Sequence, residues 1–142
     1  MFGVVSVSAE FDSMTQRPLM AFLRANNYNA RLARMVLPRT PRRFLRPGAE
    51  DDLFVRVVEN IDDVDALVRE IEADQRCVPI LLRQYLKLNG QVLGFNIDPA
   101  FGHVLDALVL VDLTCTPRPI LDRFFGRRES EAFLQQHAAV LV

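Results

Sequence analysis

The pattern of hydrophobic and polar positions predicts β-strands in three parts of the chain, with loose alternation in the first of them. Residues 2–8 contain three valines at a density that favours an opening strand. Residues 91–98 are a second strand candidate. Residues 107–113 are a stronger one, because nearly all of them are apolar. Such a run is typical of a central strand that is covered on both faces.

Other segments have the longer period of an α-helix. A helix is expected to begin at Asp12 or Ser13 and to end at Asn26 and Asn27, with Pro18 limiting how early it starts. A short helix is predicted over 31–36. Residues 51–60 are ambiguous between helix and strand.

Four more helices are predicted after residue 60. One begins at Asp62 or Asp63 and runs to Ile71, because early aspartates suit the positive end of a helix. The next has Pro79 in its first turn and stops at the Asn-Gly pair 89–90. Two further helical pieces, 120–125 and 129–138, are separated by Gly126. Proline or glycine residues, which interrupt helices, lie at the ends of these two pieces.

Residues 37–50 are predicted to be an exposed, basic, proline-rich loop, since three prolines and a glycine interrupt any regular period there. The basic character extends upstream. Residues 1–50 carry eight arginines and three acids, whereas residues 51–75 carry nine acids and two arginines. The simpler explanation of this charge asymmetry is that both segments form solvated surfaces that partly pair with one another. The more specific explanation is that the arginine-rich segment binds phosphate or an acidic partner.

The totals predict a single soluble α/β domain over 1–142, of mixed α+β type with helices flanking a layered sheet. The chain has 142 residues, 50% of them apolar and 25% charged, which suffices for one core. No run is long enough to span a bilayer, and residues 1–8 lack the pattern of a secretory signal, so the expected location is cytoplasmic. A pI near 6.1 without a recognition motif predicts no nucleic-acid partner. Two isolated cysteines and two histidines predict no disulfide and no metal.

Chemistry-bearing residues gather between two apolar elements, although phosphate loops, dinucleotide fingerprints and nucleophile elbows are absent. For Asp98 the residues allow a turn-forming carboxylate or one that orients an acceptor, and for Asp106 a loop cap or a general base. For Tyr85 they allow a core position or a general acid. The whole cluster consists of Tyr85, Lys87, Asn96, Asp98, Phe101, His103 and Asp106.

Basic residues on the predicted helix after Pro79 have two interpretations as well. Arg83 and Lys87 are solvated side chains or phosphate ligands. His103 is a structural histidine or a substrate contact.

The order of these segments resembles the hemolysin-like bacterial acyltransferases of the GNAT type, which are related to ornithine N-acyltransferases. The resemblance is carried by residues 2–8, 78–88, 94–102 and 105–113. Its most specific part is a Pro-x-Leu-Leu-x-x-Tyr-Leu-x-Leu run followed by Asp-Pro-x-Phe-Gly. It corresponds to the later part of the family's domain, so an incomplete domain is expected.

The resemblance implies a lipid acyltransferase, with acyl-CoA or an acylated acyl carrier protein as donor and an amine or lysophospholipid as acceptor. It implies Asp98, Asp106 and Tyr85 as catalytic residues, Arg83 and Lys87 as donor-binding residues, and Asn96, Phe101 and His103 as substrate-binding residues. The expected partners are an acyl carrier protein or a lipid head group.

A second hypothesis, from a different class, is a non-catalytic module that binds a partner protein or a lipid head group. The incomplete domain and the lack of a convincing acid and base pair favour it. An incomplete domain with an open parallel sheet edge is also expected to form a homodimer.

Overall fold

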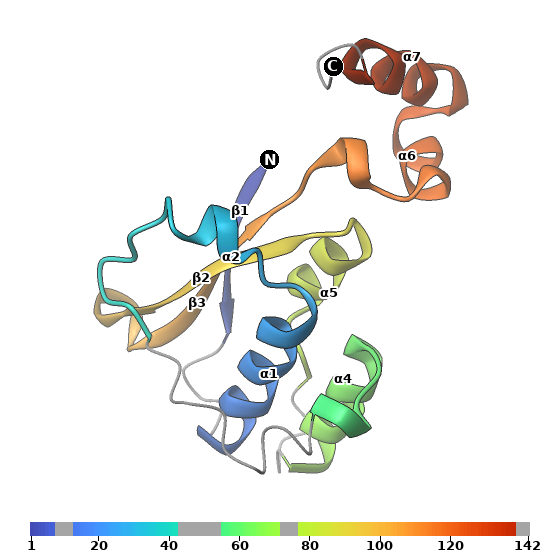
Figure 1. Cartoon of the computed structure of the whole chain (residues 1–142). Helices are drawn as coiled ribbons and strands as arrows, with labels where there is room; N and C mark the ends of the chain where they lie inside the picture. Colours follow the sequence, from blue (N-terminus) through green and yellow to red (C-terminus); the bar gives the residue numbers. More distant parts are fainter. Residues whose placement is uncertain (8–12, 43–54, 72–76, 139–142) are drawn as a thin grey trace.

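The computed structural model describes residues 1–7, 13–42, 55–71 and 77–138, which form a mixed α+β architecture (Figure 1). Its sheet contains β1 (Phe2–Val7), β2 (Gln91–Asp98) and β3 (Val104–Leu110), in the spatial order β1-β3-β2. Both neighbouring pairs are antiparallel. The predicted fold class is confirmed, and the expectation of a parallel sheet edge is wrong.

The central strand is β3, as the apolar run predicted, but it begins at Val104 and ends at Leu110. Its residues alternate between buried and half-buried, so the described elements fully cover one face only. The prediction of a strand covered on both faces is therefore wrong. Antiparallel pairing explains the difference, because such a sheet can pack on a core with one face and leave the other open.

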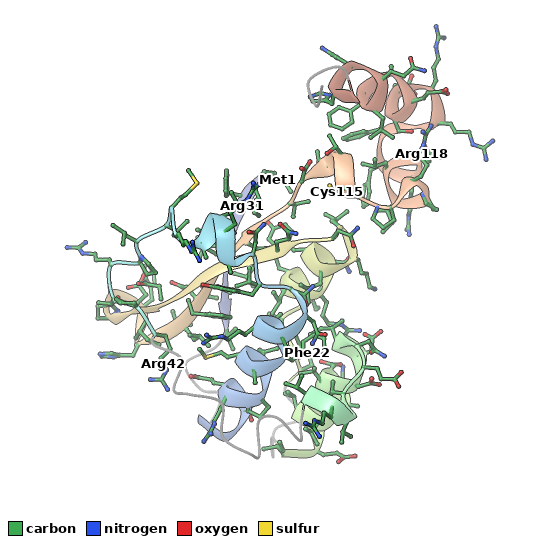
Figure 2. All side chains as sticks on the ribbon, in the orientation of Figure 1. Met1, Phe22, Arg31, Arg42, Cys115 and Arg118 are labelled. Carbon is green, nitrogen blue, oxygen red and sulfur yellow. The ribbon has the colours of Figure 1, made fainter. Side chains whose placement is uncertain are left out.

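The helix α1 (Ser13–Asn26) contains Pro18 instead of starting near it. Pro18 is the sixth residue of the helix, beyond the first four positions whose N–H groups have no helical acceptor, so it removes one helical hydrogen bond. The buried face that follows Pro18 stabilises the helix through packing. Its buried apolar residues are Leu19, Met20, Phe22 and Leu23; Phe22 is labelled in Figure 2.

The short helix α2 (Ala30–Ala33) ends earlier than predicted, and Asn29 caps it by accepting a hydrogen bond from the Leu32 N–H at 3.0 Å. The part of the predicted loop that the structure describes, 37–42, runs beside the outer edge of β2. There the Arg42 N–H donates to the Phe95 carbonyl at 3.2 Å. The remaining loop residues, 43–50, lie outside the described residues.

The helix α4 (Ile61–Ile71) begins one position before Asp62 and is capped by Asn60 instead of starting at the predicted aspartates. The Asn60 side chain accepts hydrogen bonds from the N–H groups of Asp62 and Asp63. In return, Asp63 accepts one from the Asn60 N–H at 3.1 Å. This reciprocal arrangement is a capping box. Within the ambiguous segment, residues 55–57 are helical and 51–54 are outside the described residues.

The helix α5 (Ile80–Lys87) follows Pro79 and ends at the Asn-Gly pair, as predicted. Asn89 has a left-handed φ of 59°, and the Gly90 N–H closes the turn on the Tyr85 carbonyl at 2.8 Å. A Cβ on Gly90 would lie 2.5 Å from that carbonyl oxygen, so the turn requires glycine.

The core lies between the sheet and a layer formed by α1, α4 and α5, which cover the same face of the sheet (Figure 1). Val5 and Val7 of β1 and Leu105, Ala107 and Val109 of β3 supply the buried face of the sheet.

Two further helices, α6 (Arg118–Phe125) and α7 (Arg127–Ala138), pack on each other at the end of the chain, away from the sheet (Figure 1). The 3₁₀ turns η1 (Pro99–Phe101) and η2 (Leu113–Cys115) follow β2 and β3. We call α6 and α7 the helical arm. The Thr116 hydroxyl, just before α6, donates to the Leu88 carbonyl at 3.0 Å and so connects the start of the helical arm to the end of α5.

Candidate functional site

The open face of the sheet is the one that the described helices do not cover. Its side chains are apolar near the start of β1 and polar near the end of β1. Because side chains alternate along a strand, the second, fourth and sixth residues of the chain share this face. The register pairs Phe2 with Leu110, Val4 with Leu108 and Ser6 with Asp106. We call the first four of these residues, Phe2, Val4, Leu108 and Leu110, the apolar floor.

A polar row crosses all three strands beside the apolar floor. The Ser6 hydroxyl donates to Asp106 Oδ1 at 2.6 Å, and Asn96 of β2 is the registered neighbour of Asp106. Asn96 Oδ1 in turn accepts the Thr40 N–H at 2.8 Å. We call Ser6, Asp106, Asn96 and Thr40 the polar row. Asp106 Oδ2 has no hydrogen bond from any other residue that the structure describes, so it is open to a ligand.

The predicted residues Asp98, Phe101 and His103 lie instead at the tip of the β2–β3 hairpin. Asp98 caps the η1 turn by accepting a hydrogen bond from the Ala100 N–H at 2.8 Å, which is the turn-forming role considered above. Phe101 is exposed, and His103 is exposed with a left-handed φ of 60°.

Tyr85 lies on the opposite face of the sheet from Asp106. Its ring covers Gly3, where a Cβ would lie 2.6 Å from the Tyr85 hydroxyl oxygen. Gly3 is registered with Val109, which faces the core. The structure therefore does not bring Tyr85 and Asp106 to one site, and it leaves Tyr85 as a partly buried residue of the core.

Arg83 is engaged in ion pairs that join α5 to α4. Its guanidinium contacts Asp62 at 2.7 Å and Asp65 at 3.4 Å. Lys87 is exposed in the last turn of α5. Neither side chain belongs to the polar row.

The sequence interpretation missed the contribution of the segment beside β2. Thr40 extends the polar row, and its hydroxyl also donates to the Ile97 carbonyl. Arg39 and Arg42 flank it, and both are exposed without a hydrogen bond or ion pair of the side chain within the described ranges. Figure 2 shows Arg42 where this segment reaches the hairpin end of the sheet. The arginine-rich composition of residues 1–50 was the one signal that pointed here.

Two carboxyl groups elsewhere have shifted acidity, and both have structural roles. Hydrogen bonding from the Thr114 hydroxyl lowers the pKa of Asp112. Hydrogen bonding from Ser130, assisted by Arg118, lowers the pKa of Asp122. Both stabilise turns or helices outside the sheet.

Residues 1–7, 13–42, 55–71 and 77–138 contain no group of three or more His, Cys, Asp or Glu residues that could hold a metal ion. Within the same ranges, no helix is long and apolar enough to cross a bilayer. Cys77 and Cys115 form no disulfide.

Comparison with protein-family models, with curated proteins and with solved structures finds no match for this chain. The resemblance to GNAT-type acyltransferases stays a prediction, and the open face of the sheet is the feature on which a function can be argued.

Proposed function

We propose that this chain takes part in acyl transfer from a thioester to an amine or a lysophospholipid hydroxyl, on the open face of its sheet. The observation that carries the proposal is the boundary between the apolar floor and the polar row. An acyl thioester has the same layout, since a hydrocarbon chain ends at a polar carbonyl. The segments that resemble the acyltransferase family supply both surfaces.

The apolar floor is suited to the hydrocarbon chain. Phe2 is 68% exposed and Val4 is 58% exposed, while their registered partners Leu110 and Leu108 are half-buried. Covering such surface releases about 25 cal/mol for each Å² of apolar area removed from water. A long acyl chain therefore gains affinity here that a short one lacks.

The polar row is suited to the reacting groups. The acceptor nitrogen or oxygen attacks the thioester carbonyl carbon, so that the new bond to carbon forms while the C–S bond breaks. The Asp106 carboxylate takes the proton that the acceptor loses and passes it to the departing sulfur. Ser6 donates to Oδ1 of this carboxylate, and Oδ2 has no hydrogen bond from the described residues and is the oxygen that would accept the proton.

The exposed guanidinium groups of Arg39 and Arg42 are suited to phosphate. A CoA or phosphopantetheine donor carries phosphate, and so does a lysophospholipid acceptor. Guanidinium groups bind phosphate through paired N–H donors. Both belong to the segment beside β2 that contains Thr40, a member of the polar row. This assigns the donor-binding role to residues other than Arg83 and Lys87.

The test is release of free thiol from a long-chain acyl thioester, with ornithine and with lysophosphatidic acid as acceptors. We expect Asp106→Asn to lower the acceptor-dependent rate by about 10² or more, the scale of a lost general base. Asp98→Asn is the matched control. Because asparagine still accepts the Ala100 N–H, this variant should keep the wild-type rate. Equal rates for Asp106→Asn and wild type would refute the assignment.

A second candidate is a non-catalytic module that binds acyl chains or lipid head groups on the same face. It is favoured by the position of Tyr85, which lies across the sheet from Asp106 and leaves no predicted acid beside it. In this case wild type releases no thiol beyond the uncatalysed rate, yet it still binds a fluorescent fatty acid, and Val4→Asp weakens that binding.

A further inference from the structure

The outer edge of β1 has unpaired main-chain groups along the strand. Met1 and Val111 exchange two hydrogen bonds of 2.8 Å, so they form a hydrogen-bonded pair of the antiparallel ladder. Since such pairs alternate, the N–H and C=O groups of Phe2, Val4 and Ser6 point away from β3. No described residue supplies a partner for them.

The opposite edge of the sheet is treated differently. Residues 27–29 cover the start of the outer edge of β2, with the Val92 N–H donating to Asn27 at 2.7 Å and the Asn29 N–H donating to Val92 at 3.0 Å. Residues 40–42 cover its end through Ile97 and Phe95. Within the described ranges no segment covers the outer edge of β1, and the strand lacks the charged residue or proline that usually protects an exposed edge.

We propose that a second copy of this chain pairs with β1, antiparallel, about a two-fold axis at Val4. In this register Val4 faces Val4 of the second copy, and Phe2 faces Ser6 of the second copy. Every outward N–H of these residues then meets a carbonyl, so the edge is complementary to itself.

The same pairing joins the two apolar floors. Phe2 and Val4 are the most exposed residues of the floor, and they lie at the edge where the second copy adds its own. One continuous sheet results, with both helix layers on its other face. Pairing of this kind uses the free edge once in each copy, so it closes at the dimer.

Sedimentation over a range of protein concentrations tests the dimer. Val4→Pro removes an outward N–H without touching the ladder to β3, and prolines are accepted at such edge positions. We expect wild type to dimerise and Val4→Pro to raise the dissociation constant at least about tenfold, since two hydrogen bonds are lost per dimer. Val4→Thr keeps the N–H and should dimerise like wild type. A monomeric wild type, a species larger than a dimer, or an unchanged Val4→Pro dimer overturns the proposal.

Cysteine crosslinking tests the register even if Val4→Pro fails to fold. In a Cys77→Ser, Cys115→Ser background, Val4→Cys should crosslink to its own copy under mild oxidation, because paired Cα atoms lie about 5.5 Å apart. Phe2→Cys should not, because its counterpart lies roughly 14 Å away. Equal crosslinking of both variants contradicts this register. Neither experiment depends on acyl transfer, so the dimer and the proposed activity fail or stand separately.

Discussion

Replacing Asp65 tests how α4 is held to the start of α5. The Asp65 side chain is 8% exposed. Its Oδ1 accepts the N–H of Val78, a fully buried residue, at 2.7 Å. Its Oδ2 lies 3.0 Å from Arg69 and 3.4 Å from Arg83.

The loss of the Val78 hydrogen bond sets the expected magnitude. Asp65→Ala leaves this buried N–H without an acceptor, which costs about 1–3 kcal/mol of unfolding free energy. The ion pairs add less, because the Arg69 side chain is 50% exposed and Arg83 keeps Asp62. We expect a total of about 1–4 kcal/mol for Asp65→Ala. Asp65→Asn retains an oxygen for Val78 and should cost about 1–2 kcal/mol.

Urea unfolding followed by far-ultraviolet circular dichroism measures both variants. Asp62→Ala is the matched control, since it removes the exposed pair with Arg83 and should cost less than about 1 kcal/mol. If Asp65→Ala stayed within about 0.5 kcal/mol of wild type, the buried N–H would not depend on this carboxylate. If Asp65→Asn were as costly as Asp65→Ala, the ion pairs would dominate instead, and the reasoning above would be refuted.

Two further predictions concern the packing of β1 and the helical arm. Gly3→Ala should destabilise the chain by about 1–3 kcal/mol through overpacking, since its Cβ meets the Tyr85 hydroxyl, and Tyr85→Phe should relieve part of this in thermal unfolding. The pKa of Asp122 is lowered in the folded state by Ser130 and Arg118, so its contribution to stability is present above the unfolded pKa and is lost as pH falls through the folded value. Thermal unfolding from about pH 2 to pH 7 should therefore show a larger acid-side loss below about pH 4 in wild type than in Asp122→Asn, and equal profiles would contradict this.

The sequence by itself determined the local helices and strands and the residues at which they end. The bounds of β2, the Asn-Gly stop after α5 and the break at Gly126 between α6 and α7 all follow from residues that are near neighbours in the chain. Periodicity and turn chemistry act over a few residues, so they can be interpreted without knowing the partners of each element. Pro18 is an exception. It lies inside α1 because the packing of the helix outweighs the single hydrogen bond that the proline removes.

Only the tertiary structure decided which of the candidate residues share a site. Tyr85 and Asp106 both carry plausible chemistry, yet the sheet separates them, because a strand sends successive side chains to opposite faces and the helix layer chooses which face is buried. The same long-range choice left the outer edge of β1 unpaired among the described residues and brought Thr40 to Asn96 across 56 positions of sequence. Contacts of this kind depend on how the elements pack, and no local pattern records them.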